Sequence, residues 1–198
     1  MNTQNFIYCI LRKIFGFFKT NYFSKFTAPK LITMAQNPIA VANYFIKKAN
    51  DEGIELTLMK LVKLVYIAHG WHLALKDNEL IDEAVQAWKY GPVVPSVYQV
   101  FKRFGNAQVT QAGYIVEDGQ LITPTITDED EKHFLDEVWE VYKKYDGLQL
   151  STLTHQPKTP WDIVWNKEGG NKRDSALIRN QLIKDHYLTK VKKQPDVA

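Results

Sequence analysis

The sequence contains a single cysteine, Cys9, among its 198 residues. One cysteine cannot form an internal disulfide, which excludes a disulfide scaffold and is typical of proteins in a reducing cytosol, so we expect a cytoplasmic protein. Long apolar runs are also missing: the two longest stretches without a charged residue, residues 31–46 and 104–116, both contain Asn, Gln and Thr. Because a transmembrane helix needs roughly 18 apolar residues in succession, the sequence predicts no membrane-spanning segment.

Catalytic motifs are missing as well. The sequence has no glycine-rich phosphate loop and no Gly-x-Ser-x-Gly elbow, and Cys9 has no adjacent base. His69 and His72 have a spacing that can share a metal, but they lie on a segment with the pattern of a core helix, where a backbone carbonyl satisfies a neutral histidine. A third ligand would have to come from Glu79, Asp82, His133 or His155. We therefore expect no enzymatic activity, no catalytic residue, no cofactor and no metal site.

The first 33 residues differ from the rest of the chain. They carry five basic residues, no acidic residue and eight of the 25 aromatic residues, whereas the remaining 165 residues carry 20 basic and 22 acidic residues. Such a segment fits an amphipathic membrane-surface anchor, a flexible basic arm, or sequence upstream of a natural start at Met34. We favour the last interpretation because Asn37 and Pro38 form a helix start, and we expect a chain beginning at Met34 to fold equally well. Membrane contact follows only if residues 1–33 belong to the natural chain.

From Met34 onward the pattern predicts a mainly α (α+β) fold. We expect one compact helical domain over residues 34–189, with a small β hairpin or short sheet, followed by a frayed tail over residues 190–198. Helices are predicted over residues 37–52, 57–75, 95–104, 127–145, 148–154, 160–165 and 174–189. An extended segment is predicted over residues 83–90, and a hairpin over residues 114–122, around the Asp118-Gly119 pair.

The second predicted helix, residues 57–75, is apolar on almost every side. Only a narrow charged strip interrupts it, through Lys60 and Lys63. A helix that is apolar nearly all round is a buried one, so this segment is expected to be the central core element.

The stretch from residue 87 to residue 95 combines two prolines, one glycine and nearby aromatic residues. These residues predict a rigid turn at Gly91-Pro92. Rigid aromatic side chains lose little entropy on binding, so the turn is a candidate contact surface; the alternative is that Trp88 fills the core beside the second helix. The candidate partner-binding residues are Trp88, Lys89, Tyr90, Gly91, Pro92, Val93 and Tyr98.

Short helices followed by a hairpin also fit a winged helix-turn-helix. However, the predicted hairpin carries Glu117 and Asp118 and no basic residue. A wing that contacts phosphates is expected to be basic, and the body as a whole is slightly acidic. We therefore do not expect nucleic acid as a partner.

Three sequence blocks occur in an order that resembles the Panacea-domain, or SocA-like, antitoxin family. They are LMKLVKLVYIAHGW at residues 58–71, AWKYGPV at residues 87–93 with a following Tyr98, and LSTLTH at residues 150–155 with Pro160-Trp161. The resemblance spans roughly residues 37–188, and residues 1–33 have no counterpart in it. Beyond the turn, the residues matching the family motif are Lys60, Lys63, Tyr66, Trp71, Thr154, His155, Pro160 and Trp161.

This resemblance implies an antitoxin that neutralises a cognate protein toxin by direct binding. It also implies that the toxin is encoded by the adjacent gene, and it brings no catalytic residues. Two alternatives remain: an adaptor that delivers the bound toxin to a protease, and a winged-helix-like DNA-binding regulator. The family pairs one antitoxin domain with unrelated toxins, so neither the identity of the toxin nor the stoichiometry follows from the resemblance.

Overall fold

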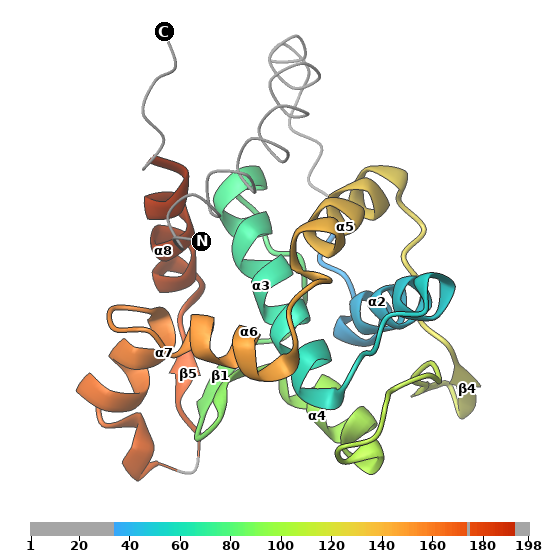
Figure 1. Ribbon diagram of the computed structural model, residues 1–198, viewed down its shortest axis with the longest axis horizontal. Coiled ribbons are helices and arrows are strands. Elements are labelled where there is room, and N and C mark those ends of the chain that lie inside the picture. Colours follow the sequence, from blue (N-terminus) through green and yellow to red (C-terminus); the bar gives the residue numbers. More distant parts are fainter. Residues whose placement is uncertain (1–33, 174, 193–198) are drawn as a thin grey trace, which may run out of the picture.

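The computed structural model describes residues 34–173 and 175–192 (Figure 1). The expectations for Cys9, for residues 1–33 and for the last six residues lie outside the described residues. The elements run in the order α2 (Pro38–Glu52), α3 (Leu58–Lys76), β1 (Val85–Trp88), β2 (Gly91–Val93), α4 (Pro95–Phe101), η2 (Lys102–Phe104), β3 (Ile115–Glu117), β4 (Gln120–Ile122), α5 (Glu129–Tyr142), α6 (Gly147–Thr154), α7 (Pro160–Asp162), η3 (Ile163–Lys167), η4 (Gly170–Lys172), β5 (Leu177–Ile178) and α8 (Asn180–Lys192). The prediction of a mainly helical fold with few strands is confirmed.

The first two helices begin and end where their capping residues predict. The Asn37 side chain accepts a hydrogen bond from the Ile39 amide at 2.8 Å, and Gly53 ends α2 in the left-handed conformation that favours glycine. Thr57 caps α3 in the same way. These local signals place α3 directly after a short connection, so that it can pack against α2.

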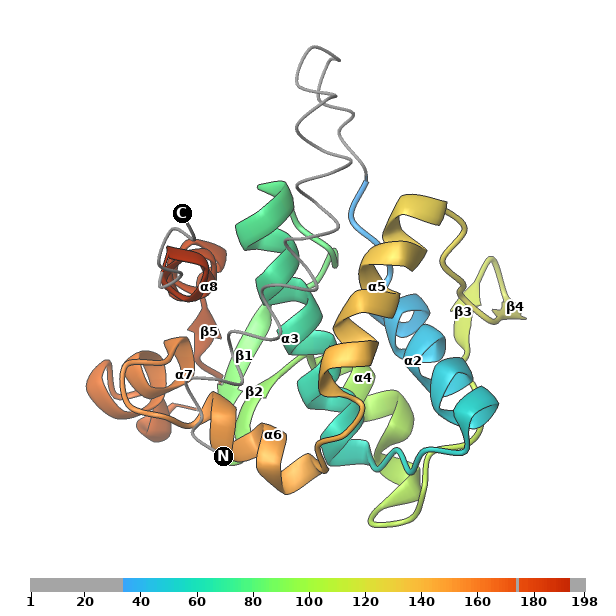
Figure 2. The ribbon, with the colours of Figure 1, turned by 45° about the horizontal axis from the view of Figure 1, so that its top comes forward.

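Helix α3 is the centre of the fold, with α2 and α5 on one side of it and α8 on the other (Figure 2). The prediction that this helix is buried and central is confirmed, and the burial extends to its two charged residues, Lys60 and Lys63. Each amine donates hydrogen bonds to backbone carbonyls, which compensates its burial. Among the described residues, no helix is long and apolar enough to cross a membrane.

The main sheet has three strands in the order β2-β1-β5, all antiparallel. The pairing of Trp88 with Gly91 closes β1 and β2 into a hairpin whose two-residue turn is Lys89 and Tyr90. The turn predicted at Gly91-Pro92 is therefore misplaced, because these residues belong to β2. Proline is tolerated there because β2 is an edge strand.

The C-terminal part differs from the prediction of one continuous helix. Strand β5 comes first and pairs with β1, and α8 then covers α3. The helices meet closely at Gly70, where a Cβ atom would lie 2.2 Å from the Tyr187 ring. Helix α8 continues to Lys192, so the first residues of the expected frayed tail are helical.

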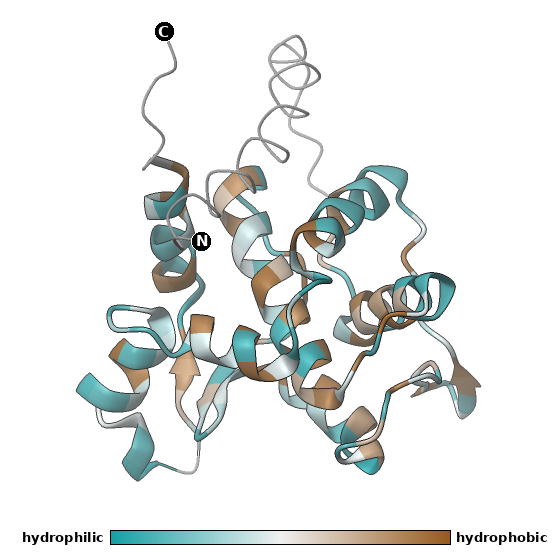
Figure 3. Ribbon diagram, viewed as in Figure 1, coloured by the Kyte–Doolittle hydropathy of each residue, from teal (hydrophilic) through white to brown (hydrophobic). Residues whose placement is uncertain are grey.

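The hairpin predicted over residues 114–122 is confirmed as β3 and β4. Asp118 and Gly119 form its two-residue loop with φ of 49° and 77°, both left-handed, as a type I′ turn requires. The strands place exposed apolar residues at the margin of the molecule (Figure 3). Within the described residues, no third strand pairs with this hairpin.

Candidate partner-binding site

Three motif blocks that lie far apart in the sequence meet at the β1–β2 hairpin. Helix α3 approaches it from one side, while the end of α6 and the short α7 approach from the others. The residues that make these contacts, here called the turn cluster, are Lys63, Trp88, Gly91, His155 and Trp161.

Lys63 holds the backbone of the turn. Its amine donates to the Tyr90 carbonyl at 2.6 Å and to the Pro92 carbonyl at 3.1 Å. Among the described residues, no carboxylate forms an ion pair with this amine. Burial therefore disfavours the ammonium form and lowers the pKa of Lys63 to about 7.

Gly91 lies where a side chain has no room. Its φ is +107°, a conformation that residues with a Cβ rarely adopt. A Cβ atom would also lie 2.5 Å from the Lys63 amine and 2.7 Å from the His155 ring. Glycine at this position lets the amine and the imidazole approach the strand closely.

The third motif block closes the other side of the hairpin. The Trp161 indole N–H donates to the Trp88 carbonyl at 2.7 Å, and its ring packs on the His155 ring with 4.0 Å between centroids. His155 Nδ1 donates to the Ser151 carbonyl at 2.6 Å, which fixes the imidazole orientation. Pro160 is the first residue of α7, which Thr159 caps, so local helix geometry aims Trp161 at β1.

The seven candidate contact residues separate into three groups by exposure. Lys89 and Tyr90, at the turn, are exposed, and the Tyr90 side chain is 66% accessible. Trp88 and Tyr98 are half-buried and pack edge to face, with ring centroids 5.0 Å apart. The remaining three are buried in β2: Gly91, Pro92 and Val93.

The other family-motif residues support helix packing at a distance from the turn. The Lys60 amine donates to the carbonyls of Glu55 and Lys143, which ties the start of α3 to the end of α5. Tyr66 and Trp71 contact the Tyr187 ring of α8, and the Trp71 indole also donates to the Tyr142 hydroxyl. Thr154 donates to the Ser151 carbonyl within α6.

The two histidines of α3 have protein partners. His69 Nε2 donates to the Asn180 side-chain oxygen at 3.0 Å, and burial lowers the pKa of His69. His72 faces the Asn78 carbonyl with one nitrogen and the Glu131 carboxylate with the other. Within residues 34–173 and 175–192, no three potential ligands gather around a metal-sized site.

Glu131, in the first turn of α5, links this helix to α3. It is buried and receives hydrogen bonds from His72 and Lys76, both on α3. Burial alone would raise the pKa of Glu131, but its hydrogen bonds and electrostatic interactions with His72 and Lys76 outweigh burial and lower the pKa. No sequence pattern indicated this contact, because 59 residues separate Glu131 from His72.

The protein is a small helical domain in which Lys63, His155 and Trp161 support the exposed turn between β1 and β2. The family described as "Antitoxin SocA-like, Panacea domain" has a model that matches residues 61–162. Antitoxin SocA of Caulobacter vibrioides is 30% identical over 151 residues, which cover 75% of this chain and 80% of that protein. No solved structure matches the chain. The chain belongs to the SocA-like, Panacea-domain family of antitoxins.

Proposed function

We propose that this protein neutralises a cognate toxin by binding it directly, with the exposed end of the β1–β2 hairpin as the contact surface. The observation that carries the proposal is the convergence of all three motif blocks on this hairpin. Lys63, His155 and Trp161 hold the backbone, while Lys89 and Tyr90 face solvent. Such an arrangement fits a recognition site better than a purely structural turn, which needs no exposed aromatic side chain.

Preorganisation supports this role for the turn. Binding costs free energy when loops and side chains must be ordered, and a rigid scaffold lowers that cost. Tyrosine supplies a large contact area with few rotatable bonds, and it is enriched among the residues that dominate binding energy. Tyr90 on a turn that is already fixed meets both conditions.

Further exposed apolar groups lie at the end of α6 that is farther from the turn. The C-terminal end of this helix lies against Gly91 through His155, and its N-terminal end lies beside Met59. Leu148 is 72% exposed at that N-terminal end, and Met59 is also exposed. A toxin that covers Tyr90 and extends along α6 would therefore bury apolar surface at both ends of the helix.

The test is co-expression with the protein encoded by the adjacent gene, followed by measurement of cell rescue and of the dissociation constant of the purified pair. We expect Lys89→Glu and Tyr90→Ala to weaken binding at least tenfold without lowering the melting temperature. Lys47→Glu is the matched charge control, because Lys47 is exposed on α2 and this helix lies away from β1 (Figure 1). Wild-type affinity and rescue in both turn variants would exclude this turn as the contact surface.

The same experiment separates neutralisation from protease delivery. Both require the binding step, but an adaptor shortens the half-life of the bound toxin in cells, whereas a neutralising antitoxin leaves the complex intact. The proposal places both proteins in the cytoplasm and requires no catalytic step. The acidic β3–β4 loop gives no support to the DNA-binding alternative.

A further inference from the structure

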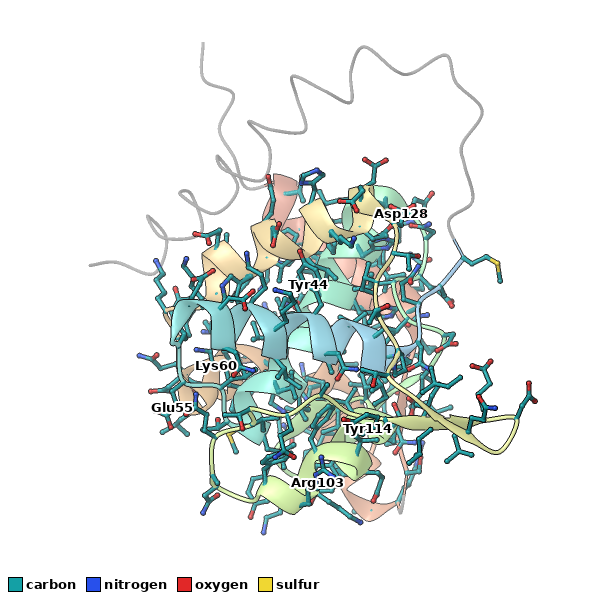
Figure 4. All side chains as sticks on the ribbon, turned by 90° about the vertical axis from the view of Figure 1, so that its right-hand side faces the viewer. Tyr44, Glu55, Lys60, Arg103, Tyr114 and Asp128 are labelled. Atoms are coloured by element: carbon teal, nitrogen blue, oxygen red, sulfur yellow. The ribbon has the colours of Figure 1, made fainter. Side chains whose placement is uncertain are left out.

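The β3–β4 hairpin extends away from the helical body beyond Tyr114 (Figure 4). The side chains of Val116 and Leu121 are 71% and 75% exposed, and the two residues are paired across the strands. Tyr114, which directly precedes β3, is also exposed. The hairpin therefore presents two paired aliphatic side chains on one solvent-facing side, with an exposed aromatic residue next to the strand.

The backbone of this hairpin is also available for pairing. In a hairpin with a two-residue loop, the residues that flank the loop, Glu117 and Gln120, exchange hydrogen bonds with each other. The next pair, Val116 and Leu121, is then the non-hydrogen-bonded pair, whose N–H and C=O groups point outward. Figure 2 places β4 on the outer side of β3, so the outward groups of Leu121 lie at an open edge. Leu121 thus offers an outward N–H, an outward C=O and an exposed apolar side chain.

The sequence segment that contains this hairpin carries charge of one sign, and Lys132, which follows the segment, forms an ion pair with Glu129. Residues 104–131 contain six acidic residues and no lysine or arginine. Glu117 and Asp118 are exposed at the loop of the hairpin, and Asp128–Asp130 are exposed at the start of α5. A segment that pairs with β4 would be attracted by this charge if it carried lysine or arginine.

A second copy of this chain fits the edge less well. Three-residue strands bury far less than the roughly 800 Å² per partner of a stable interface, so the edge needs an additional contact elsewhere. Two copies would also bring their acidic loops and base-free segments together. A partner with a second contact at the β1–β2 turn and a basic segment at β4 meets both requirements.

We infer that β4 is a second docking element, which receives an extended segment of the toxin as an added strand. This inference rests on the proposed function, because it takes the toxin as the occupant. The segment has alternating apolar side chains that cover Leu121 and Val116, and lysine or arginine beside Glu117 and Asp118. Main-chain hydrogen bonds supply the pairing, and the exposed apolar face and the acidic loop select the segment.

The experiment uses the full chain and the purified protein encoded by the adjacent gene. Leu121→Pro removes the outward N–H, and Leu121→Lys adds a charge that repels a basic segment. Gln111→Lys is the matched control, since it adds the same charge at an exposed position of the base-free segment outside the strands. We expect both Leu121 variants to weaken binding at least tenfold and Gln111→Lys to change it less than twofold. In hydrogen exchange, the Leu121 amide is expected to become protected only in the complex.

The possible outcomes separate the two proposals. Unchanged affinity in Leu121→Lys, with no protection of the Leu121 amide, would overturn the docking role of β4 and leave the proposed function intact. Failure of the wild-type chain to bind the adjacent gene product would overturn both. A wild-type dimer that Leu121→Lys converts to a monomer would identify a second copy as the occupant and overturn the inference. If Leu121→Pro unfolds the hairpin, Leu121→Lys decides, because an exposed lysine is compatible with the strand.

Discussion

The part of the chain that the structure describes contains two hairpins with two-residue loops, and they differ in burial and in their contacts with the rest of the fold. The β1–β2 hairpin is buried along β2 and contacts three helical segments. The β3–β4 hairpin is mostly exposed and pairs only with itself among the described residues. The same local structure is thus stabilised by distant residues in one case and by its loop in the other.

This difference implies different local stabilities. Opening the β1–β2 hairpin breaks the Lys63 and Trp161 hydrogen bonds and exposes buried side chains, so we expect it to unfold only with the whole domain. The β3–β4 hairpin has few contacts to lose, and isolated two-stranded hairpins are marginal in water. The four predictions that follow test this contrast, from the largest expected effect to the smallest.

Gly91→Ala is expected to lower the free energy of unfolding by about 3 kcal/mol. The new Cβ atom meets the Lys63 amine and the His155 ring, and the positive φ adds backbone strain. Gly119→Ala in the other hairpin is the matched control, since it has positive φ but open space, and it is expected to cost about 1 kcal/mol. Chemical denaturation of both variants measures the difference, and equal losses would contradict the contrast between the hairpins.

Lys63 is expected to make stability rise with pH. Its pKa is about 7 in the folded chain and 10.5 when unfolded, so between these values the unfolded state binds more protons and higher pH favours folding. Over pH 7.5–9.5 the expected gain is about 2 kcal/mol. Lys63→Met should lose this dependence, and denaturation of both proteins across that range tests it. If the free energy of unfolding of Lys63→Met rises with pH as steeply as that of the wild type, other groups cause the effect.

One strand valine from each hairpin, Val93 and Val116, is expected to respond differently to truncation. Val93→Ala removes two buried methylene equivalents and should cost about 1.5 kcal/mol. Val116→Ala removes the same atoms from an exposed strand and should cost less than about 0.5 kcal/mol. Thermal melting of both variants provides the comparison, and a large loss in Val116→Ala would show that the β3–β4 hairpin packs on the body.

The smallest effect on stability is expected for Lys89→Glu. Lys89 is exposed at the turn, so the free energy of unfolding should change by less than about 0.5 kcal/mol. Far-ultraviolet circular dichroism and denaturation check this, beside the binding measurement proposed above. A substantial destabilisation would mean that the turn residues hold the hairpin together themselves rather than being held by Lys63.

The sequence predicted features with local causes. The caps at Asn37 and Thr57, the apolar surface of α3 and the type I′ loop at Asp118-Gly119 each depend on neighbouring residues, and each was found. The motif blocks also identified the region of the candidate site. Whether that region contacts a toxin stays a prediction.

Features that depend on contacts with residues far away in the sequence were missed. Lys63 looked like a surface residue because its carbonyl partners lie 27 and 29 residues away, beyond a loop. The turn was misplaced because Gly91-Pro92 has the composition of a turn, yet pairing with β1 makes it a strand. Strand β5 has two residues and is defined only by its partner β1, so no pattern within it could indicate a strand.

The Lys63 side chain binds the turn through the backbone carbonyls of Tyr90 and Pro92. These hydrogen bonds do not involve the side chains of residues 89 and 90. Every amino acid has a backbone carbonyl, so these two positions can mutate while the frame that supports them keeps its geometry. If this turn is the contact surface, as proposed, substitutions at these two positions would change the choice of toxin at little cost in stability, because the supporting contacts do not involve their side chains.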